Sequence, residues 1–420
     1  MGSVSEVIDI DDLVRPRLTD VQQQILEYTE SKHVELDIEA MLSEAIAQAG
    51  VDDLADTDGF GDRLAAHVAA IEADDGLRQL TRMTLRGRII RLLRNRLSLT
   101  ELLKRHPEIE SIEIERPIIV VGMPRSGTTH LVNLVAADPG RRALPYWESQ
   151  EPIPAPGQGP DINGLDPRYV RSKAEHDAMM ATTPLIAAMH DRFPEAIEEE
   201  VEVLDLDLAS YVLEWHARVP DWRDYYLTLD QYRHYAYLKT VLQALTFLRG
   251  PRTWVLKSPQ HSEQLGPLMA TFPDATVAFT HRDPVAVIQS AVTMIAYGDR
   301  MRRTSIDPGT LIAYWSDRVH HLLSAGVRDR HLVPADRSID INFHDLNGNE
   351  MPLLKRLYAA GGIELTSKAR KGFQRYLDSN PRGKHGRVRY DLQRHFGVSP
   401  DDLRRRFDFY FDRFDVRPES

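Results

Sequence analysis

The sequence contains no cysteine, and this absence excludes several kinds of chemistry. Disulfide bonds, thiolate nucleophiles, iron–sulfur clusters and cysteine-ligated zinc sites all require cysteine. A chain without disulfides also fits a reducing compartment. Hydrophobic residues make up 42% of the 420 residues and charged residues 27%, which is the composition of an ordinary globular enzyme with a large core.

Long apolar runs are missing as well. No stretch approaches the roughly 18 apolar residues that cross a bilayer, and the N-terminus lacks the basic and apolar regions of a signal peptide. We therefore expect a cytoplasmic protein without a membrane span. The formal net charge of -11 disfavours nucleic acid as a partner, and no spacing of candidate ligands predicts a metal site.

The first 106 residues divide into an acidic and a basic segment. Residues 1–76 hold 19 acidic and 4 basic residues, whereas residues 77–106 hold 9 basic residues and 1 acidic residue. Both segments repeat apolar residues at helical spacing, so we predict a helical N-terminal region over residues 1–115. The basic segment could bind RNA or a membrane surface, but we favour a solvated helix face that the preceding acidic helices neutralise.

From residue 117 onward the pattern changes to alternating strands and helices. Residues 117–121, PIIVV, form an apolar run rich in β-branched residues, which is typical of a strand buried on both faces. The alternation predicts an α/β domain over residues 116–420, with a mostly parallel central sheet flanked by helices. Ligands of such sheets bind at the carboxyl ends of the strands. Further strands are expected at residues 254–256, 276–279 and 339–343, and helices at residues 131–137, 232–248 and 284–294.

A glycine-rich loop follows the first predicted strand. Residues 122–129, GMPRSGTT, have the glycine spacing of a phosphate-binding P-loop, but Thr128 occupies the position of its lysine. Converging backbone N–H groups and the start of a helix would hold an anion there, and Arg125 can supply the missing cation. The loop predicts a P-loop-type, three-layer α/β fold. Without the lysine that normally contacts the phosphates of ATP, another phosphate-bearing donor is the better expectation.

The PRSGTT part of this loop resembles the 5′-phosphosulfate loop of bacterial-type P-loop sulfotransferases, which use 3′-phosphoadenosine-5′-phosphosulfate (PAPS). The resemblance implies that Arg125, Ser126, Gly127, Thr128 and Thr129 hold the 5′-phosphate and the transferring sulfuryl group. It implies transfer of that group to a hydroxyl or amine of a small-molecule, lipid or carbohydrate acceptor, with no metal. A homodimer is compatible with this interpretation.

Other segments fit the same resemblance. Arg282 follows another predicted strand and Ser290 comes eight residues later, and the family grips the 3′-phosphate of PAPS with an arginine and a serine at this separation. Lys257 lies in a segment, 256–261, that resembles the family's lysine segment beside the donor. Arg382 and Lys384 lie in residues 380–386, which resemble the basic loop that closes over the nucleotide. The resemblance extends from about residue 117 to the C-terminus and includes the late strand and turn at residues 341–346.

Catalysis of sulfuryl transfer needs positioning, stabilisation of the leaving group and a base. By this resemblance Arg125 and Lys257 would stabilise the charge that grows on the leaving phosphate oxygen. His261 is one candidate base, although cytosolic small-molecule sulfotransferases place their histidine two residues after the lysine rather than four. Glu148 is the other, because tyrosylprotein sulfotransferases carry a base glutamate after the first P-loop helix. The sequence slightly favours His261.

Two further patterns and two rival functions remain open. The aromatic-rich residues 215–237 could line an acceptor pocket, but core packing is the favoured interpretation. Glu198, Glu199 and Glu200 could face an acceptor, but we favour a solvated face. The rival functions are an ATP-dependent phosphotransferase of the P-loop type, with Thr129 as a Mg²⁺ ligand, and a non-catalytic nucleotide-binding regulatory protein.

Overall fold

The computed structural model of the protein describes residues 7–55, 59–160, 164–346, 348–381 and 386–419. Its strands are β1 (Val7–Ile8), β2 (Ile118–Gly122), β3 (Arg141–Arg142), β4 (Thr253–Lys257), β5 (Thr276–His281), β6 (Ser338–Asn342) and β7 (Arg387–Val388). Its helices are α1 (Asp20–Glu30), α2 (Ile38–Ala49), α3 (Phe60–Glu72), α4 (Gln79–Arg105), α5 (Thr128–Ala136), α6 (Tyr146–Gln150), α7 (Pro167–Thr182), α8 (Ile186–His190), α9 (Val201–Leu204), α10 (Pro220–Tyr226), α11 (Gln231–Arg249), α12 (Leu265–Thr271), α13 (Pro284–Arg302), α14 (Pro308–Asp329), α15 (Phe343–Leu346), α16 (Glu350–Ala360), α17 (Ser367–Ser379), α18 (Leu392–Phe396), α19 (Pro400–Arg404) and α20 (Asp408–Arg413).

A five-stranded sheet forms the centre of the molecule. Its strand order is β3-β4-β2-β5-β6, and every pair of neighbours is parallel. The predicted α/β fold with a parallel sheet is therefore confirmed, as are the strands expected near residues 117, 254, 276 and 339. Because all strands run the same way, the loops after β2, β4, β5 and β6 meet at one edge of the sheet.

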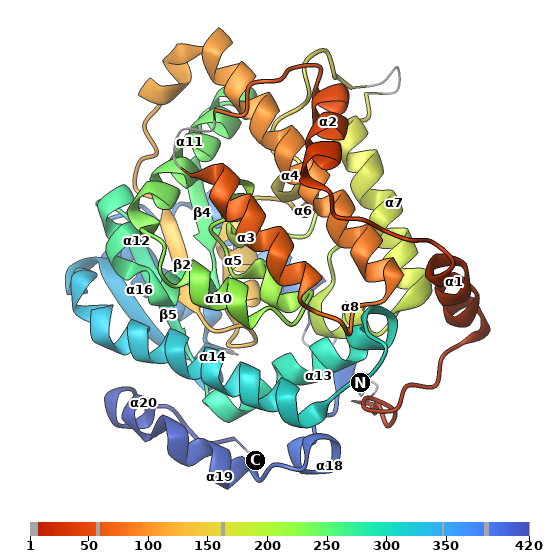
Figure 1. The fold of residues 1–420 in the computed structure, drawn as a ribbon. Coiled ribbons are helices and arrows are strands. Elements are labelled where there is room, and N and C mark those ends of the chain that lie inside the picture. Colours follow the sequence, from red (N-terminus) through yellow and green to blue (C-terminus); the bar gives the residue numbers. More distant parts are fainter. Residues whose placement is uncertain (1–6, 56–58, 161–163, 347, 382–385, 420) are drawn as a thin grey trace.

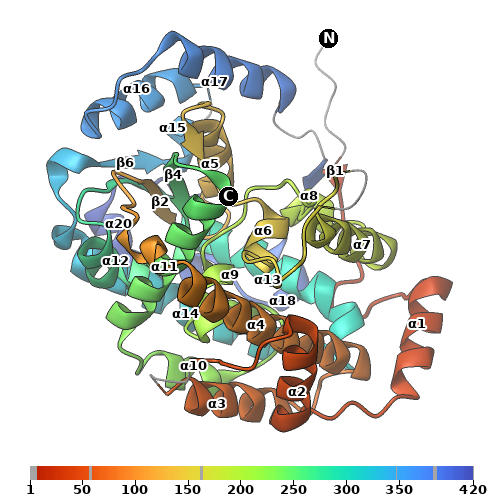
Figure 2. The ribbon, with the colours of Figure 1, turned by 90° about the horizontal axis from the view of Figure 1, so that it is seen from above.

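Both faces of the sheet are covered by helices (Figure 2), which explains the continuous apolar runs in the sequence. Alternate residues of β2 point to opposite faces. Ile118 and Val120 pack in a cluster with residues of α5, α16 and α17. Ile119 and Val121 pack in another cluster with residues of α11 and α12. This arrangement is the three-layer architecture that the sequence predicts.

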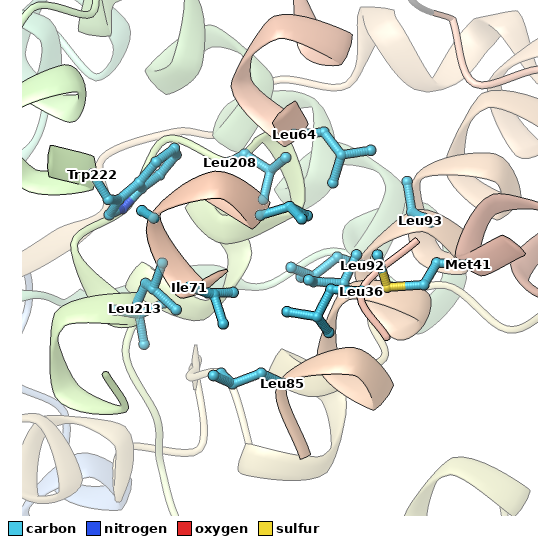
Figure 3. Close-up of a cluster of buried hydrophobic side chains, with 14 of the residues drawn as sticks. Leu36, Met41, Leu64, Ile71, Leu85, Leu92, Leu93, Leu208, Leu213 and Trp222 are labelled. Carbon is cyan, nitrogen blue, oxygen red and sulfur yellow. The ribbon is translucent and has the colours of Figure 1, made fainter. Parts of the chain in front are cut away.

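The N-terminal region is helical, as predicted, and its helices α1–α4 are drawn in red to orange in Figure 1. A hydrophobic cluster joins α2–α4 to residues 201–226. Figure 3 shows Leu64 of α3 beside Leu208 and Ile71 of α3 beside Leu213. A domain boundary between residues 115 and 116 stays a prediction.

The basic helix α4 is more buried than the sequence suggested. Arg86 pairs with Glu44 of α2 at 2.9 Å, in keeping with neutralisation by the preceding acidic helices. A solvated face is nevertheless wrong for Arg88 and Arg96, which are only 7% and 5% exposed. Their partners lie more than a hundred residues later, in the segment that follows α8. Among the helices of the described residues, none combines the length and the apolar character that crossing a bilayer requires.

Candidate active site

The loop between β2 and α5 is shaped by two glycines. A Cβ atom on Gly122 would stand 2.1 Å from the Thr280 hydroxyl of β5, so glycine is needed where these strands approach. Gly127 has a φ of 92°, and a Cβ there would lie 2.8 Å from the Leu346 side chain. Thr128 and Thr129 then open α5, so their backbone N–H groups face the loop at the positive end of the helix dipole.

Ser126 stabilises the loop from within. Its side chain is buried, and its hydroxyl donates to the Met123 carbonyl oxygen at 2.6 Å and lies 2.7 Å from the Thr280 hydroxyl. The Ser126 hydroxyl is therefore used in hydrogen bonds within the loop and with β5. The Ser126 backbone N–H also donates to the Met123 carbonyl oxygen, at 3.2 Å, so both donors of this residue are used within the loop and its role in binding an anion stays a prediction.

Arg125 is at the centre of a cluster with Arg282 and Ser290. Its φ of 68° is one that a non-glycine residue adopts where its surroundings enforce it. The Arg125 Nε donates to the Ser290 hydroxyl of α13 at 3.0 Å, and its Nη1 donates to the Met189 carbonyl oxygen. The Arg282 Nη1 donates to the Arg125 carbonyl oxygen at 2.5 Å. Three residues predicted from distant motifs are thus brought together.

The guanidinium of Arg282 already holds a carboxylate. Its Nε and Nη2 each donate at 2.7 Å to one oxygen of Glu419, in the bidentate geometry that also suits phosphate. Glu419 is fixed in turn, because its backbone N donates to Asp283 and its carbonyl oxygen accepts from Arg404, both at 2.8 Å. Arg282 also lies over the ring of Phe343, with 4.0 Å between the guanidinium carbon and the ring centroid.

An acidic run lies beside the lysine at the end of β4. The Lys257 Nζ donates to Glu199 Oε1 at 2.5 Å, and the Lys257 backbone N donates to Glu200 Oε2 at 2.7 Å. Glu198 lies 3.6 Å from His190 and 3.8 Å from Arg192. The prediction of a solvated face is wrong, since Glu198 is 4% and Glu200 1% exposed.

Neighbouring carboxyl groups in this run have opposite ionisation preferences. Burial raises the pKa of Glu200 well above its usual range, and the Lys257 backbone hydrogen bond opposes this only in part. Burial acts in the same direction on Glu198. There the hydrogen bond with His190 and the positive charge of Arg192 prevail, and the pKa lies below the usual range. Glu198 is therefore an anion, while the protonated form of Glu200 is favoured.

His261, one predicted base, lies in the 3₁₀ helix Pro259–Glu263 and is fully buried. Its Nδ1 is 2.8 Å from the Tyr235 hydroxyl, and its Nε2 is 3.5 Å from Glu200 Oε2. Burial lowers the pKa of His261 to about 3, so the ring is neutral. The structure therefore places this histidine in the interior.

Glu148, the other predicted base, is buried between two arginines. Its Oε2 accepts from Arg142 Nη2 and its Oε1 from Arg249 Nε, each at 2.8 Å. Both oxygens are thus occupied by charge-assisted hydrogen bonds, an arrangement that links α6 to β3 and α11.

A cavity of about 850 Å³ opens at the carboxyl edge of the sheet. Among the described residues, its walls include neither His261 nor Glu148, whereas Lys257 and Ser290 lie directly behind the wall, each bonded to a residue on it. Arg382 and Lys384 lie outside the described residues. The residues on the wall include Arg125, Gly127, Thr128, Thr129, Arg282, Glu198, Glu199, Trp215, Phe343 and Glu419.

The aromatic-rich segment is mostly core, as favoured. Trp222, Tyr226 and Tyr235 are completely buried. Two residues differ: Tyr232 is 54% exposed, and Trp215 lies on the cavity wall. Together with Glu198 and Glu199, Trp215 is a site residue to which the motifs gave no role.

Comparisons with known proteins agree with this geometry. Residues 117–367 match the family model described as the sulfotransferase family. The structure resembles sulfotransferase STF9 from Mycobacterium avium, at 23% identity over 92% of this chain and 98% of that chain, with a TM-score of 0.80. It also resembles sulfotransferase STF1 from Mycobacterium tuberculosis H37Rv, at 26% identity over 88% of this chain and 98% of that chain, with a TM-score of 0.76. No curated protein matches the sequence.

Proposed function

The chain belongs to the sulfotransferase family, and on this premise we propose that it transfers a sulfuryl group from PAPS to a hydroxyl or amine of a small-molecule, lipid or carbohydrate acceptor. The observation that carries the proposal is the cavity at the carboxyl edge of the sheet, which we call the donor cavity. Arg125 and Arg282 come from loops after adjacent strands and line it together with the N-terminus of α5. Such a set suits an elongated ligand with two anionic groups.

The residues fit the two phosphate groups of the donor at separate places. The backbone N–H groups of Gly127, Thr128 and Thr129 would hold the 5′-phosphate with Arg125. Arg282 and Ser290 would hold the 3′-phosphate, and the carboxylate of Glu419 supports this because it already occupies the fork of Arg282 as an anionic stand-in. Arg382 and Lys384 would close over the nucleotide.

Glu199 suits the role of general base better than either residue proposed from sequence. It is a carboxylate on the wall of the donor cavity, whereas His261 and Glu148 lie behind other groups. We therefore assign to Glu199 the proton of the acceptor hydroxyl. The donor supplies an activated sulfuryl group, whose bond to the phosphate oxygen breaks as the acceptor oxygen bonds to sulfur.

Lys257 would couple this proton transfer to departure of the leaving group. Its Nζ lies 2.5 Å from Glu199 Oε1, which orients the carboxylate. When Glu199 takes the proton, its negative charge disappears. The Lys257 ammonium can then face the charge that grows on the leaving phosphate oxygen, and Arg125 adds a second cation.

Binding measurements separate this proposal from the two rival functions. The thermal stabilisation of the full chain is measured with 3′-phosphoadenosine-5′-phosphate (PAP) and with ATP, each with and without Mg²⁺. We expect PAP to raise the Tm without Mg²⁺, because Arg282 and the loop supply the cationic contacts. Arg282→Ala should abolish most of the shift, whereas Arg356→Ala, on the exposed surface of α16, should leave it unchanged.

The outcomes assign the function. Stabilisation by Mg-ATP alone would indicate a phosphotransferase and contradict the proposal. Stabilisation by PAP without transfer of radiolabelled sulfate from PAPS to any of a broad panel of alcohols, phenols and amines would indicate a binding protein.

A further inference from the structure

A second cavity, of about 1380 Å³, adjoins the donor cavity. Its walls come from α4 on one side and from α7, α8 and α13 on the other, and these helices can be followed in Figure 2. It shares His190, Arg192, Trp215 and Met294 with the donor cavity. The volume exceeds the roughly 300–1,000 Å³ of most small-molecule pockets, so there is room for a large ligand.

Two glycines in helix interiors line this cavity, and one of them leaves open space beside it. Gly87 lies in the middle of α4 and Gly298 in α13, and both line the cavity. Glycine is a poor helix former, so its use at these places calls for a reason other than helix stability. A Cβ on Gly87 would meet nothing within 4 Å, and one on Gly298 would first meet the Arg302 side chain. The open space beside Gly87 is therefore available to a ligand.

The charges on the walls are already satisfied. Within the described residues, each arginine that lines the cavity has a carboxylate within 3.8 Å. Arg88 pairs with Glu202 and Arg94 with Glu151, both at 2.6 Å. A carboxylate, phosphate or sulfate on the ligand would have to break one of these pairs, because the walls offer it no spare cation.

The apolar part of the walls is rich in methionine. Met83, Met179, Met294 and Met301 come from three different helices and all line the cavity. Methionine side chains are unbranched and polarisable, so they adapt to irregular apolar shapes. Met83 is 41% exposed, so its side chain is accessible at the wall of this cavity.

We propose that this second cavity is the acceptor site and that its ligand is an uncharged, predominantly apolar alcohol of the size of a sterol or a long-chain alcohol. The hydroxyl would lie at the wall shared with the donor cavity, where Trp215 and Met294 separate the two. The apolar body would lie between α4 and α13. This inference rests on the proposed function, since it names the acceptor class of the same reaction.

Direct binding tests the inference without donor or catalysis. The probe is dehydroergosterol, a fluorescent sterol alcohol, and the signal is energy transfer from Trp215, with Trp215→Phe to identify the donor tryptophan. We expect saturable binding that Gly87→Met weakens by about tenfold, since the new side chain fills the cavity. Gln374→Met introduces the same side chain on the exposed face of α17 and should leave binding unchanged.

Competition tests the chemical class. 1-Dodecanol should displace the sterol, whereas dodecanoate and glucose should not. Failure of both alcohols to bind, an unchanged affinity in Gly87→Met, or equal competition by dodecanoate would each overturn the inference. If PAP stabilises the protein but no alcohol binds, the proposed acceptor site alone is overturned. If an alcohol binds but PAP does not stabilise the protein, the proposed function is contradicted instead.

Discussion

Two halves of one acidic segment bury their carboxylates against different partners. In residues 202–207 the partners include arginines of the N-terminal helices: Arg88 contacts Glu202 at 2.6 Å, and Asp207 accepts from two other arginines and lies 2.6 Å from His234 Nδ1. In residues 198–200 the partners include Lys257 and His190, and two of the three carboxylates lie on the donor cavity. Residues 202–207 fasten the N-terminal helices to the rest of the chain, with Glu202 also on the cavity wall, and residues 198–200 contain the proposed general base.

The two halves differ in how much they rely on guanidinium partners, although His234 contacts Asp207 and Arg192 lies 3.8 Å from Glu198. A guanidinium does not lose its proton at accessible pH, and its fork satisfies a carboxylate completely, so such a pair is suited to structure. Lysine and histidine bind a carboxylate through fewer contacts and can exchange protons. Burial alone therefore does not distinguish a structural acid from a functional one.

The largest expected effect tests the functional half. Glu199→Gln should lower kcat by about 100- to 10,000-fold, the contribution of a positioned general base. The amide keeps the shape of the side chain but leaves the buried Lys257 ammonium without its counter-charge, so the Tm should fall, whereas the affinity for PAP should change little. Steady-state kinetics below the Tm, thermal unfolding and PAP titration measure the three quantities, and Glu195→Gln, an exposed acid nearby, is the control. Loss of transfer in Glu148→Gln or in His261→Asn, but not in Glu199→Gln, would contradict the assignment.

The next effect tests the structural half. Arg88→Met should lower the free energy of unfolding by about 3–5 kcal/mol, because two buried carboxylates lose their counter-charge. Urea denaturation measures it. Arg86→Met, one position before Gly87 on the same helix, removes a pair that is partly exposed and should cost less than about 1 kcal/mol. Equal losses in the two variants would show that burial of the pair does not matter.

A third effect depends on pH and has opposite signs for two carboxyl groups of this segment, Glu200 and Glu202. Burial raises the pKa of Glu200, so the folded state holds this proton more tightly and the resulting stability is lost as pH rises above the unfolded value of about 4.3. For Glu202 the charges of Arg88 and Arg192 outweigh burial and lower the pKa, so its stabilisation appears as pH rises.

Unfolding measured across acid to neutral pH should therefore separate two matched variants. Relative to the wild type, Glu200→Gln should gain stability as pH rises, and Glu202→Gln should lose it. Parallel pH dependences in the two variants would contradict the opposite pKa shifts of Glu200 and Glu202.

The smallest effect concerns Glu419, whose carboxylate must leave Arg282 before the 3′-phosphate of PAP can bind there. The side chains of Arg282 and Glu419 are 17% and 19% exposed, so their ion pair contributes only modestly. Glu419→Gln should tighten PAP binding by about three- to tenfold, since the 3′-phosphate no longer competes with an anion. Isothermal titration measures this, with the exposed Glu364→Gln as control. Weaker binding in Glu419→Gln would show that the carboxylate supports the donor site.

Much of the fold could be predicted from sequence because the central strands are buried on both faces. Because of this burial, β2, β4 and β5 each contain a continuous apolar run, and the loop after β2 has its own glycine pattern. β3, β1 and β7 were not predicted. Each has two residues, and β3 is a pair of arginines at the sheet edge, so no periodicity can reveal it.

Candidate site residues could be proposed from sequence where a loop has its own pattern, but not where distant segments meet. Arg125 and Arg282 follow strand ends and contact each other, with Ser290 of α13 beside Arg125, and their roles stay predictions. Glu199 faces Lys257 from 58 residues away, and no local pattern encodes that contact. One signal was available: acidic residues between 198 and 207 alternate with valine and leucine, which a fully solvated run would not need.

The crystal structure of the full chain with PAP tests the central claim most directly. We expect the guanidinium of Arg282 to exchange the Glu419 carboxylate for the 3′-phosphate, which Ser290 also contacts. The backbone N–H groups of residues 127–129 should hold the 5′-phosphate, with Glu199 still exposed to the cavity beside it. PAP bound elsewhere, or bound here with Arg282 still paired to Glu419, would contradict this claim.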